Sequence, residues 1–213
     1  LRGFLRLLTQ SSAYQLSSSY DHEWKYEYLS LFPRHYPRRL DAEEVHDAIV
    51  QATGVPARYT YSLINNQTVA QGTALKQSEP VGSAYKLPDT SEPRNNGAVV
   101  LFLNAFMRGN RDTAFRSQSG SILQQLNIMN DNFVTSRIKT TGTTASPVLV
   151  AATKLGENSS VVEQLWLRFL GRMPSDYEKD KAMGYLSKAT SRNTAVEDLA
   201  WVCINKLDFL FSY

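Results

Sequence analysis

Helix-start signals are the feature that most constrains how this chain can fold. In a capping box, an N-cap side chain and an acidic side chain three residues later satisfy each other's backbone N–H groups. The chain contains three such pairs, Asp41 with Glu44, Ser175 with Glu178, and Thr194 with Glu197. Because these pairs precede apolar residues at helical spacing, they predict three helix starts, at Asp41, Ser175 and Thr194.

Apolar periodicity adds further helices to these three. Leu1, Phe4, Leu5 and Leu8 follow helical spacing, with arginines on the other side. The segments 120–138 and 159–172 carry similar patterns, the first with Ile122, Leu123, Leu126, Met129 and Phe133 along one apolar face. A partial alternation at 59–64 favours a short strand. We therefore predict a mostly α, multi-helix globular domain with long irregular loops and at most a small β element.

The 213 residues fit one domain, covering 1–213. Residues 55–97 are rich in Asn, Gln, Ser, Thr, Pro and Gly, which predicts an irregular excursion. The Thr-rich stretch 140–147 predicts a linker before a C-terminal three-helix unit. Because the chain opens inside an amphipathic pattern without an initiator Met, we expect it to be the C-terminal part of a longer protein.

Composition excludes several classes of protein. The net charge is only +3, which does not favour a nucleic-acid-binding protein. Cys203 is the single cysteine, so neither an internal disulfide nor a cysteine-based zinc site is possible, and its apolar surroundings predict a buried, inert thiol. The apolar runs are shorter than the ~18 residues of a membrane span. No P-loop, dinucleotide fingerprint or serine-hydrolase elbow occurs.

An Arg-rich loop follows the most apolar run of the chain. The sequence FMRGNRDTAFR places Arg108, Arg111 and Arg116 around Asp112 and a Gly-Asn turn. Guanidinium groups match the geometry of carboxylate, sulfate or phosphate, so the three arginines are candidates for anion or partner binding, with Asp112 as a weak catalytic candidate. In the alternative interpretation Asp112 pairs with an arginine or a helix N-terminus and only ties the loop to the domain. We favour this structural interpretation.

A second basic segment, RHYPRR, spans residues 34–39. Arg38 and Arg39 are further candidates for anion or partner binding, and His35 is a second weak catalytic candidate. The acidic first turn of the helix that follows offers local salt bridges as the simpler explanation. His46 in EEVHD lies near Glu43 and Asp47, which is a weak pattern for a metal site. We favour solvated or structural histidines, and predict no metal site.

Four segments, in this order along the chain, resemble the motifs of one bacterial family. They are RHYPRRLDAEEVHDAI (34–49), NRDTAFRSQSGSILQQLNIMNDNFV (110–134), LWLRFLGRMPSDYE (165–178) and EDLAWVCINKLDFLF (197–211). Together they resemble the C-terminal domain of planctomycete-type cytochrome c-associated proteins, bacterial domain of unknown function 1553. The resemblance covers the whole chain and is weakest across 55–97.

The resemblance implies a periplasmic or secreted location, but no established reaction or catalytic residue. We expect a non-catalytic interaction or assembly module with a protein partner, such as a c-type cytochrome or a larger assembly. We expect no cofactor in this chain, with haem on other domains or partners, no nucleic-acid partner and no membrane span. The alternative hypothesis is a hydrolase or binding domain acting on a polysaccharide or another anionic polymer, with Asp112, Arg108, Arg111 and His35 at its site.

Overall fold

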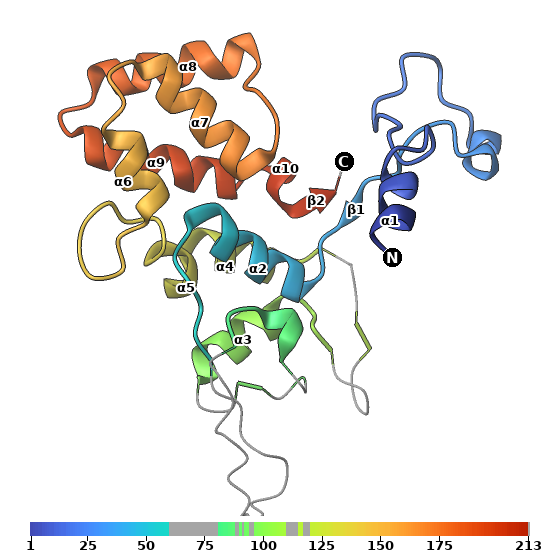
Figure 1. Cartoon of the computed structure of the whole chain (residues 1–213), viewed down its shortest axis with the longest axis horizontal. Coiled ribbons are helices and arrows are strands. Elements are labelled where there is room, and N and C mark those ends of the chain that lie inside the picture. Colours follow the sequence, from blue (N-terminus) through green and yellow to red (C-terminus); the bar gives the residue numbers. More distant parts are fainter. Residues whose placement is uncertain are drawn as a thin grey trace, which may run out of the picture. The chain divides into compact units, whose positions relative to one another are not determined.

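The protein is mostly α-helical, as a computed structural model of the chain shows (Figure 1). The structure describes residues 1–59, 81–87, 90, 92–93, 96–109, 115–116 and 120–212. The chain divides into two compact units, residues 1–39 with 211–213 and residues 40–210. The predicted strand at 59–64 is represented only by Tyr59, which forms an isolated bridge with Val81, because residues 60–64 lie outside the described ranges.

The first unit has little regular structure. It contains helix α1 (Arg2–Thr9), a 3-10 helix η1 (Tyr26–Leu31) and a two-stranded antiparallel sheet of β1 (Arg38–Arg39) and β2 (Phe211–Ser212). The prolines at 33 and 37 come only after η1 has ended, so they do not interrupt it.

An aromatic cluster takes the place of an aliphatic core in this unit. Trp24 makes T-shaped contacts with Tyr28 and Tyr36, at centroid separations of 6.0 Å and 6.2 Å. The Arg34 guanidinium lies 4.4 Å from the centroid of the Trp24 ring, within the range of a cation–π contact. Arg34 also donates to the carbonyl of Ser18 at 3.1 Å. The aromatic residues of the first third of the chain therefore hold loops together by packing on each other and on one arginine.

The second unit is a helical core. Its helices are α2 (Ala42–Thr53), α3 (Gly97–Ala105), α4 (Ile122–Asn130), α5 (Asn132–Thr135), α6 (Pro147–Thr153), α7 (Asn158–Leu170), α8 (Asp176–Lys188), α9 (Arg192–Ile204) and α10 (Leu207–Leu210), with a short 3-10 helix η2 (Ala84–Lys86). Helix α2 contacts α3, η2, α6 and α7, so it connects the C-terminal helices to the rest of this unit. Helices α7, α8 and α9 pack on one another through apolar faces.

Two of the three predicted capping boxes form. Asp41 caps α2 with Glu44, and Ser175 caps α8 with Glu178. Thr194 does not start a helix, because α9 already begins at Arg192 with Ser191 as its N-cap. The Glu197 carboxylate instead accepts hydrogen bonds from the backbone N–H and the hydroxyl of Thr140, both at 2.6 Å. A contact between distant parts of the chain thus replaces the local one.

The apolar face predicted for residues 120–138 is also wrong in part. The helix ends at Asn130, and Asp131 caps a separate short helix, α5. In the predicted face, Ile122, Leu123 and Leu126 are exposed and Phe133 is buried. Gln124 and Ile128, which lie outside that face, are buried as well. Ile128 therefore lies in the core, where the helical spacing predicted the neighbouring residues of the apolar face.

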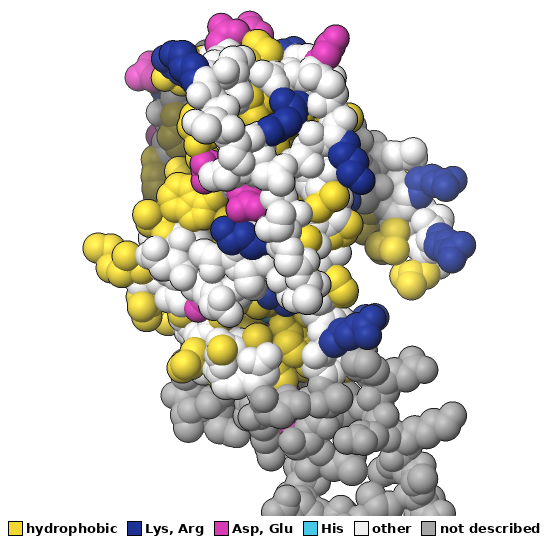
Figure 2. Space-filling model, turned by 90° about the vertical axis from the view of Figure 1, so that its left-hand side faces the viewer, with side chains coloured by type: hydrophobic (Ala, Val, Ile, Leu, Met, Phe, Trp, Pro, Cys, Tyr) yellow, Lys and Arg dark blue, Asp and Glu magenta, His cyan; other side chains and the backbone are white. Residues whose placement is uncertain are grey.

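Other details of the fold follow the sequence more closely. Cys203 is fully buried in α9, and burial raises the pKa of its thiol to about 12, as expected for an inert cysteine. None of the helices in the described ranges combines the length and apolarity needed to span a bilayer. On the face of the molecule seen in Figure 2, basic and acidic side chains are scattered among hydrophobic ones.

Candidate functional site

The first turn of α2 holds a buried carboxylate between two arginines. Glu43 is 3% exposed, although it occupies the second position of the helix. The Nε of Arg108 donates to its Oε1 at 3.1 Å. The two terminal nitrogens of Arg116 donate to Oε2 at 2.9 Å and to Oε1 at 2.7 Å. We call this arrangement of Glu43, Arg108 and Arg116 the buried knot.

The turn after α3 positions Arg108 beside Glu43 in the buried knot. Met107 has φ of 59° and Gly109 has φ of 67°, so the backbone enters the left-handed region on both sides of Arg108. The N–H of Arg108 bonds back to the Leu103 carbonyl at 3.3 Å, which closes the end of α3. The side chain of Arg108 is 2% exposed and also donates from Nη1 to the carbonyls of Thr90 and Glu92, at 2.8 Å and 2.7 Å.

Arg116 holds the solvent side of the knot. Its guanidinium makes the bidentate pairing that is among the strongest side-chain hydrogen bonds. About half of the side chain (49%) is exposed, and Asp41 lies 3.9 Å from its Nη1. A cavity of about 210 Å³ adjoins the knot and is lined by Glu43, Ala84, Tyr85, Leu87, Thr90, Arg108 and Arg116. The carboxylate of Glu43 thus occupies the position that an external anion would take beside the two arginines.

The structure brings together only part of the predicted site. Arg108 and Arg116 meet in the buried knot. Arg111 and Asp112 lie outside the described residues, so the predicted pairing of Asp112 stays a prediction. The residues Arg38, Arg39 and His35 belong to the other compact unit, where the two arginines form β1. The backbone N–H of His35 bonds to the Ser17 carbonyl at 2.9 Å, and its buried Nε2 has no hydrogen-bond partner in the described part of the chain.

Sequence reasoning missed the role of Glu43. It grouped Glu43 with the other acids of the first helical turn, as a local partner for the basic segment 34–39. One signal was present in the sequence: Asp41 and Glu44 already form the capping box, which leaves Glu43 free for another role. The burial of Glu43 depends on tertiary packing and has no local signature.

A second polar cluster lies one turn further along α2. His46 is fully buried, and both of its ring nitrogens are bonded, Nδ1 to Asp47 Oδ1 at 2.8 Å and Nε2 to the Tyr59 hydroxyl at 2.7 Å. The imidazole stacks on Phe133 with ring centroids 4.5 Å apart. Asp47 also accepts a hydrogen bond from the Ala84 N–H at 2.7 Å. This cluster therefore ties α2 to α5, to Tyr59 and to η2.

Burial sets the protonation of this cluster. It lowers the pKa of His46 despite the opposing effect of the Asp47 carboxylate, so the imidazole is held neutral. Burial also raises the pKa of Tyr59 to about 12. For Asp47, burial acts to raise the pKa, but the hydrogen bonds from His46, Ser83 and Ala84 outweigh it and the pKa is lowered. A neutral imidazole then donates from Nδ1 to Asp47 and accepts from the Tyr59 hydroxyl at Nε2.

The weak metal pattern of Glu43, His46 and Asp47 is not assembled. The Glu43 carboxylate is held by arginines, and both nitrogens of His46 are bonded within the protein. Across the described ranges, no group of three or more His, Cys, Asp or Glu side chains is placed to hold a metal ion.

Comparison with known proteins identifies the family of this chain. The family model described as PSD1, protein of unknown function (DUF1553), matches residues 1–186. No curated protein and no solved structure matches the chain.

Proposed function

Because the chain belongs to the PSD1 family of proteins of unknown function (DUF1553), we propose its role from its own surface: it is a non-catalytic interaction or assembly module. The contact surface in this proposal is the apolar face of α1. The single observation that carries the proposal is that this helix exposes large apolar side chains instead of burying them.

Helix α1 is strongly amphipathic, and no residue in it is buried. The apolar face is 61% exposed at Phe4, 50% at Leu5 and 45% at Leu8. Contiguous exposed apolar side chains on a protein surface typically mark a binding surface. An isolated helix of this length is marginal in water, so packing against a partner would also stabilise it.

The chemistry of the helix defines the partner. Arg2 and Arg6 lie on the side of the helix away from its apolar residues, so an apolar groove complements the contact face and acidic groups at its outer rim complement the arginines. The family resemblance adds the identity of the partner to the proposal: a c-type cytochrome domain, either alone or within a larger assembly. The haem then belongs to the partner, and both proteins lie in the periplasm or outside the cell.

The alternative, a hydrolase or binding domain for an anionic polymer, has less support. It would use Arg108 and Arg116 to hold the substrate, and both arginines already bind the carboxylate of Glu43. A substrate that displaced Glu43 would separate this buried carboxylate from the two arginines, at a cost of several kcal/mol.

The proposal is tested by sedimentation velocity of the purified chain mixed with an acidic c-type cytochrome, followed at the haem absorbance. We expect the cytochrome to sediment faster in the presence of the chain. The double substitution Leu5→Asp and Leu8→Asp should weaken the complex at least about tenfold, because it places charge in the apolar contact. The matched control is Leu101→Asp, which changes a leucine that is 71% exposed on α3.

Two outcomes contradict this proposal. An unchanged sedimentation of the cytochrome across micromolar concentrations would remove the cytochrome as partner. Equal weakening by Leu101→Asp and by the double substitution in α1 would remove α1 as the contact surface.

A further inference from the structure

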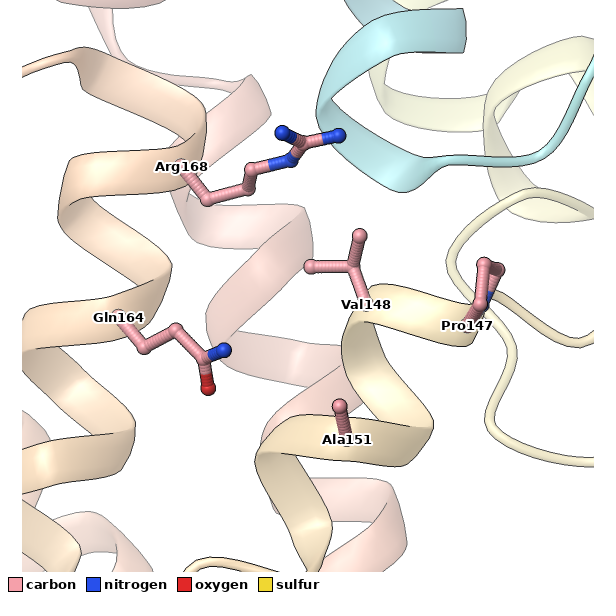
Figure 3. A pocket seen from close by; sticks show the side chains of 5 residues that line it. All are labelled: Pro147, Val148, Ala151, Gln164 and Arg168. Atoms are coloured by element: carbon pink, nitrogen blue, oxygen red, sulfur yellow. The ribbon is translucent and has the colours of Figure 1, made fainter.

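A groove between α6 and α7 has the features of a ligand site (Figure 3). Its volume is about 370 Å³, and Pro147, Val148, Ala151, Gln164 and Arg168 line it. The first three residues come from α6 and form an apolar floor, whereas Gln164 and Arg168 stand on the opposing helix α7. The site lies wholly within the helical unit and is separate from α1.

Arg168 presents a hydrogen-bond donor at one end of the groove. Its Nε donates to the Ala52 carbonyl at 3.1 Å, and its Nη2 donates to the Gln51 carbonyl, so two of its nitrogens are used at the end of α2. Its Nη1 makes no hydrogen bond to any residue in the described ranges. The bonds to α2 hold the guanidinium in place, and the remaining nitrogen keeps its donors for a ligand.

Gln164 presents a second donor one helical turn away. Its Oε1 is shut off from solvent and has no hydrogen-bond partner in the described part of the molecule. The amide extends from α7 towards α6, beside Ala151 (Figure 3). The amide nitrogen lies on the side of the amide that faces α6 (Figure 3). Residues four apart on a helix lie on the same face, so both side chains extend from α7 on the side of the groove, with the Arg168 guanidinium nearer the end of α2 (Figure 3).

These groups favour a ligand that carries a carboxylate next to an apolar group. None of the five lining residues is acidic, and both polar members offer N–H donors. The last residue of a peptide has an α-carboxylate and a side chain on the same carbon atom. An internal Asp or Glu instead holds its carboxylate away from a neighbouring apolar side chain.

We propose that the α6–α7 groove binds the C-terminus of a partner peptide that ends in a branched apolar residue. The α-carboxylate accepts hydrogen bonds from Arg168 Nη1 and from the Gln164 amide. The last side chain packs on Pro147, Val148 and Ala151. This inference goes beyond the role proposed for α1, because it concerns a different surface and a different ligand chemistry.

Two-dimensional NMR of the isotope-labelled chain tests the inference, with the peptide acetyl-Gly-Gly-Leu as probe. We expect shifts of the backbone amides around Ala151 and Gln164 on titration with the free acid, and no such shifts with the same peptide bearing a C-terminal amide. Ala151→Leu fills the groove and should weaken binding at least about tenfold. Gln164→Leu should also weaken it, while thermal stability is maintained or raised because a buried unsatisfied oxygen is removed.

Matched controls separate this inference from the role of α1. Ala98→Leu, at an exposed alanine of α3, should leave peptide binding unchanged, and so should the double substitution Leu5→Asp and Leu8→Asp. Equal shifts with the free acid and the amidated peptide would overturn the inference. An absence of shifts in the groove at millimolar free-acid peptide would do the same, whatever the cytochrome experiment shows.

Discussion

Two glutamates in the first turns of two helices hold similar arginine-rich clusters in very different surroundings. Glu43 of α2 binds Arg108 and Arg116 in the buried knot. Glu178 of α8 accepts hydrogen bonds from both terminal nitrogens of Arg172, at 2.8 Å and 2.9 Å, and lies 2.8 Å from Lys206 Nζ. We call this second cluster the surface knot. The two are alike in chemistry, but Arg108 is 2% exposed and Arg172 is 38% exposed.

The difference in exposure shows how burial changes the contribution of an ion pair to the stability of the fold. Charges in the surface knot keep part of their hydration, so removing one partner leaves the others solvated. Arg108 in the buried knot is shielded from water, so loss of the Glu43 carboxylate removes an opposite charge that hydration cannot replace. We therefore expect the buried knot to hold α2 to the turn after α3, and the surface knot mainly to fix the start of α8.

The largest expected effect comes from Glu43→Gln. The substitution keeps the shape of the side chain but removes the charge that compensates Arg108 and Arg116. We expect the free energy of unfolding to fall by about 3–5 kcal/mol, as for other buried pairs that lose one partner. Urea unfolding followed by far-ultraviolet circular dichroism measures the loss. A loss below about 1 kcal/mol would be similar to that of a surface pair. It would show that burial does not make the buried knot contribute more to stability than the surface knot.

The next effect is a pH dependence that arises from His46 in α2. The folded-state pKa of His46 is lowered, so below the unfolded value of about 6.5 the unfolded chain takes up a proton that the folded chain refuses. Stability should be highest above that pH and fall as the pH drops below it, by at most about 1.4 kcal/mol per pH unit. Asp47 and Tyr59 are hydrogen-bonded to the ring, and the charges of Arg137 and Arg108 also act on it, both lowering its pKa.

Unfolding titrations from pH 7 to pH 5 measure this slope, with His46→Asn as the comparison. The variant should be less stable at neutral pH, because it disturbs the bonds to Asp47 and Tyr59, but its stability should depend less on pH in this range. The same slope in both proteins would assign the pH dependence to other groups.

The smallest effect is expected from Glu178→Gln in the surface knot. Hydrogen bonds from Arg172 lower the pKa of Glu178, so the carboxylate contributes stability above its unfolded value of about 4.5 and loses it as the pH falls further. We expect Gln to cost about 1 kcal/mol or less at pH 7, since the side chain can still accept the N-cap hydrogen bond from Ser175. Thermal unfolding at steps between pH 7 and pH 3 checks this: the difference between the parent and the variant should shrink as the pH falls below about 4.5. A difference that stays constant over this range would assign the contribution to packing instead of charge.

Local chemistry predicted most of the helices and failed where distant contacts decided the outcome. The capping boxes at Asp41 and Ser175 formed because their partners lie within one turn. The third failed because α9 begins three residues earlier, with Ser191 as its N-cap, and Glu197 bonds instead to Thr140, which is 57 residues away in the sequence. The exposed apolar face of α4 shows the same limit, since periodicity identifies a face but not the direction in which it points.

The candidate site was predictable in its cations but not in its anion. The spacing of Arg108 and Arg116 around a turn indicated a carboxylate-binding arrangement. The carboxylate itself, Glu43, is 65 residues from Arg108, and no local pattern connects the two. The groove between α6 and α7 was likewise not visible in the sequence, because it depends on how two helices pack.

One comparison tests most directly whether contact with a partner belongs to α1 while the loop arginines serve the fold. Cytochrome binding and melting temperature are measured together for the double substitution Leu5→Asp and Leu8→Asp and for Arg116→Gln. We predict that the α1 variant loses binding without a change in melting temperature, and that Arg116→Gln melts at a lower temperature but still binds below its transition. Loss of binding by a stable Arg116→Gln variant, with full binding by the α1 variant, would contradict the account.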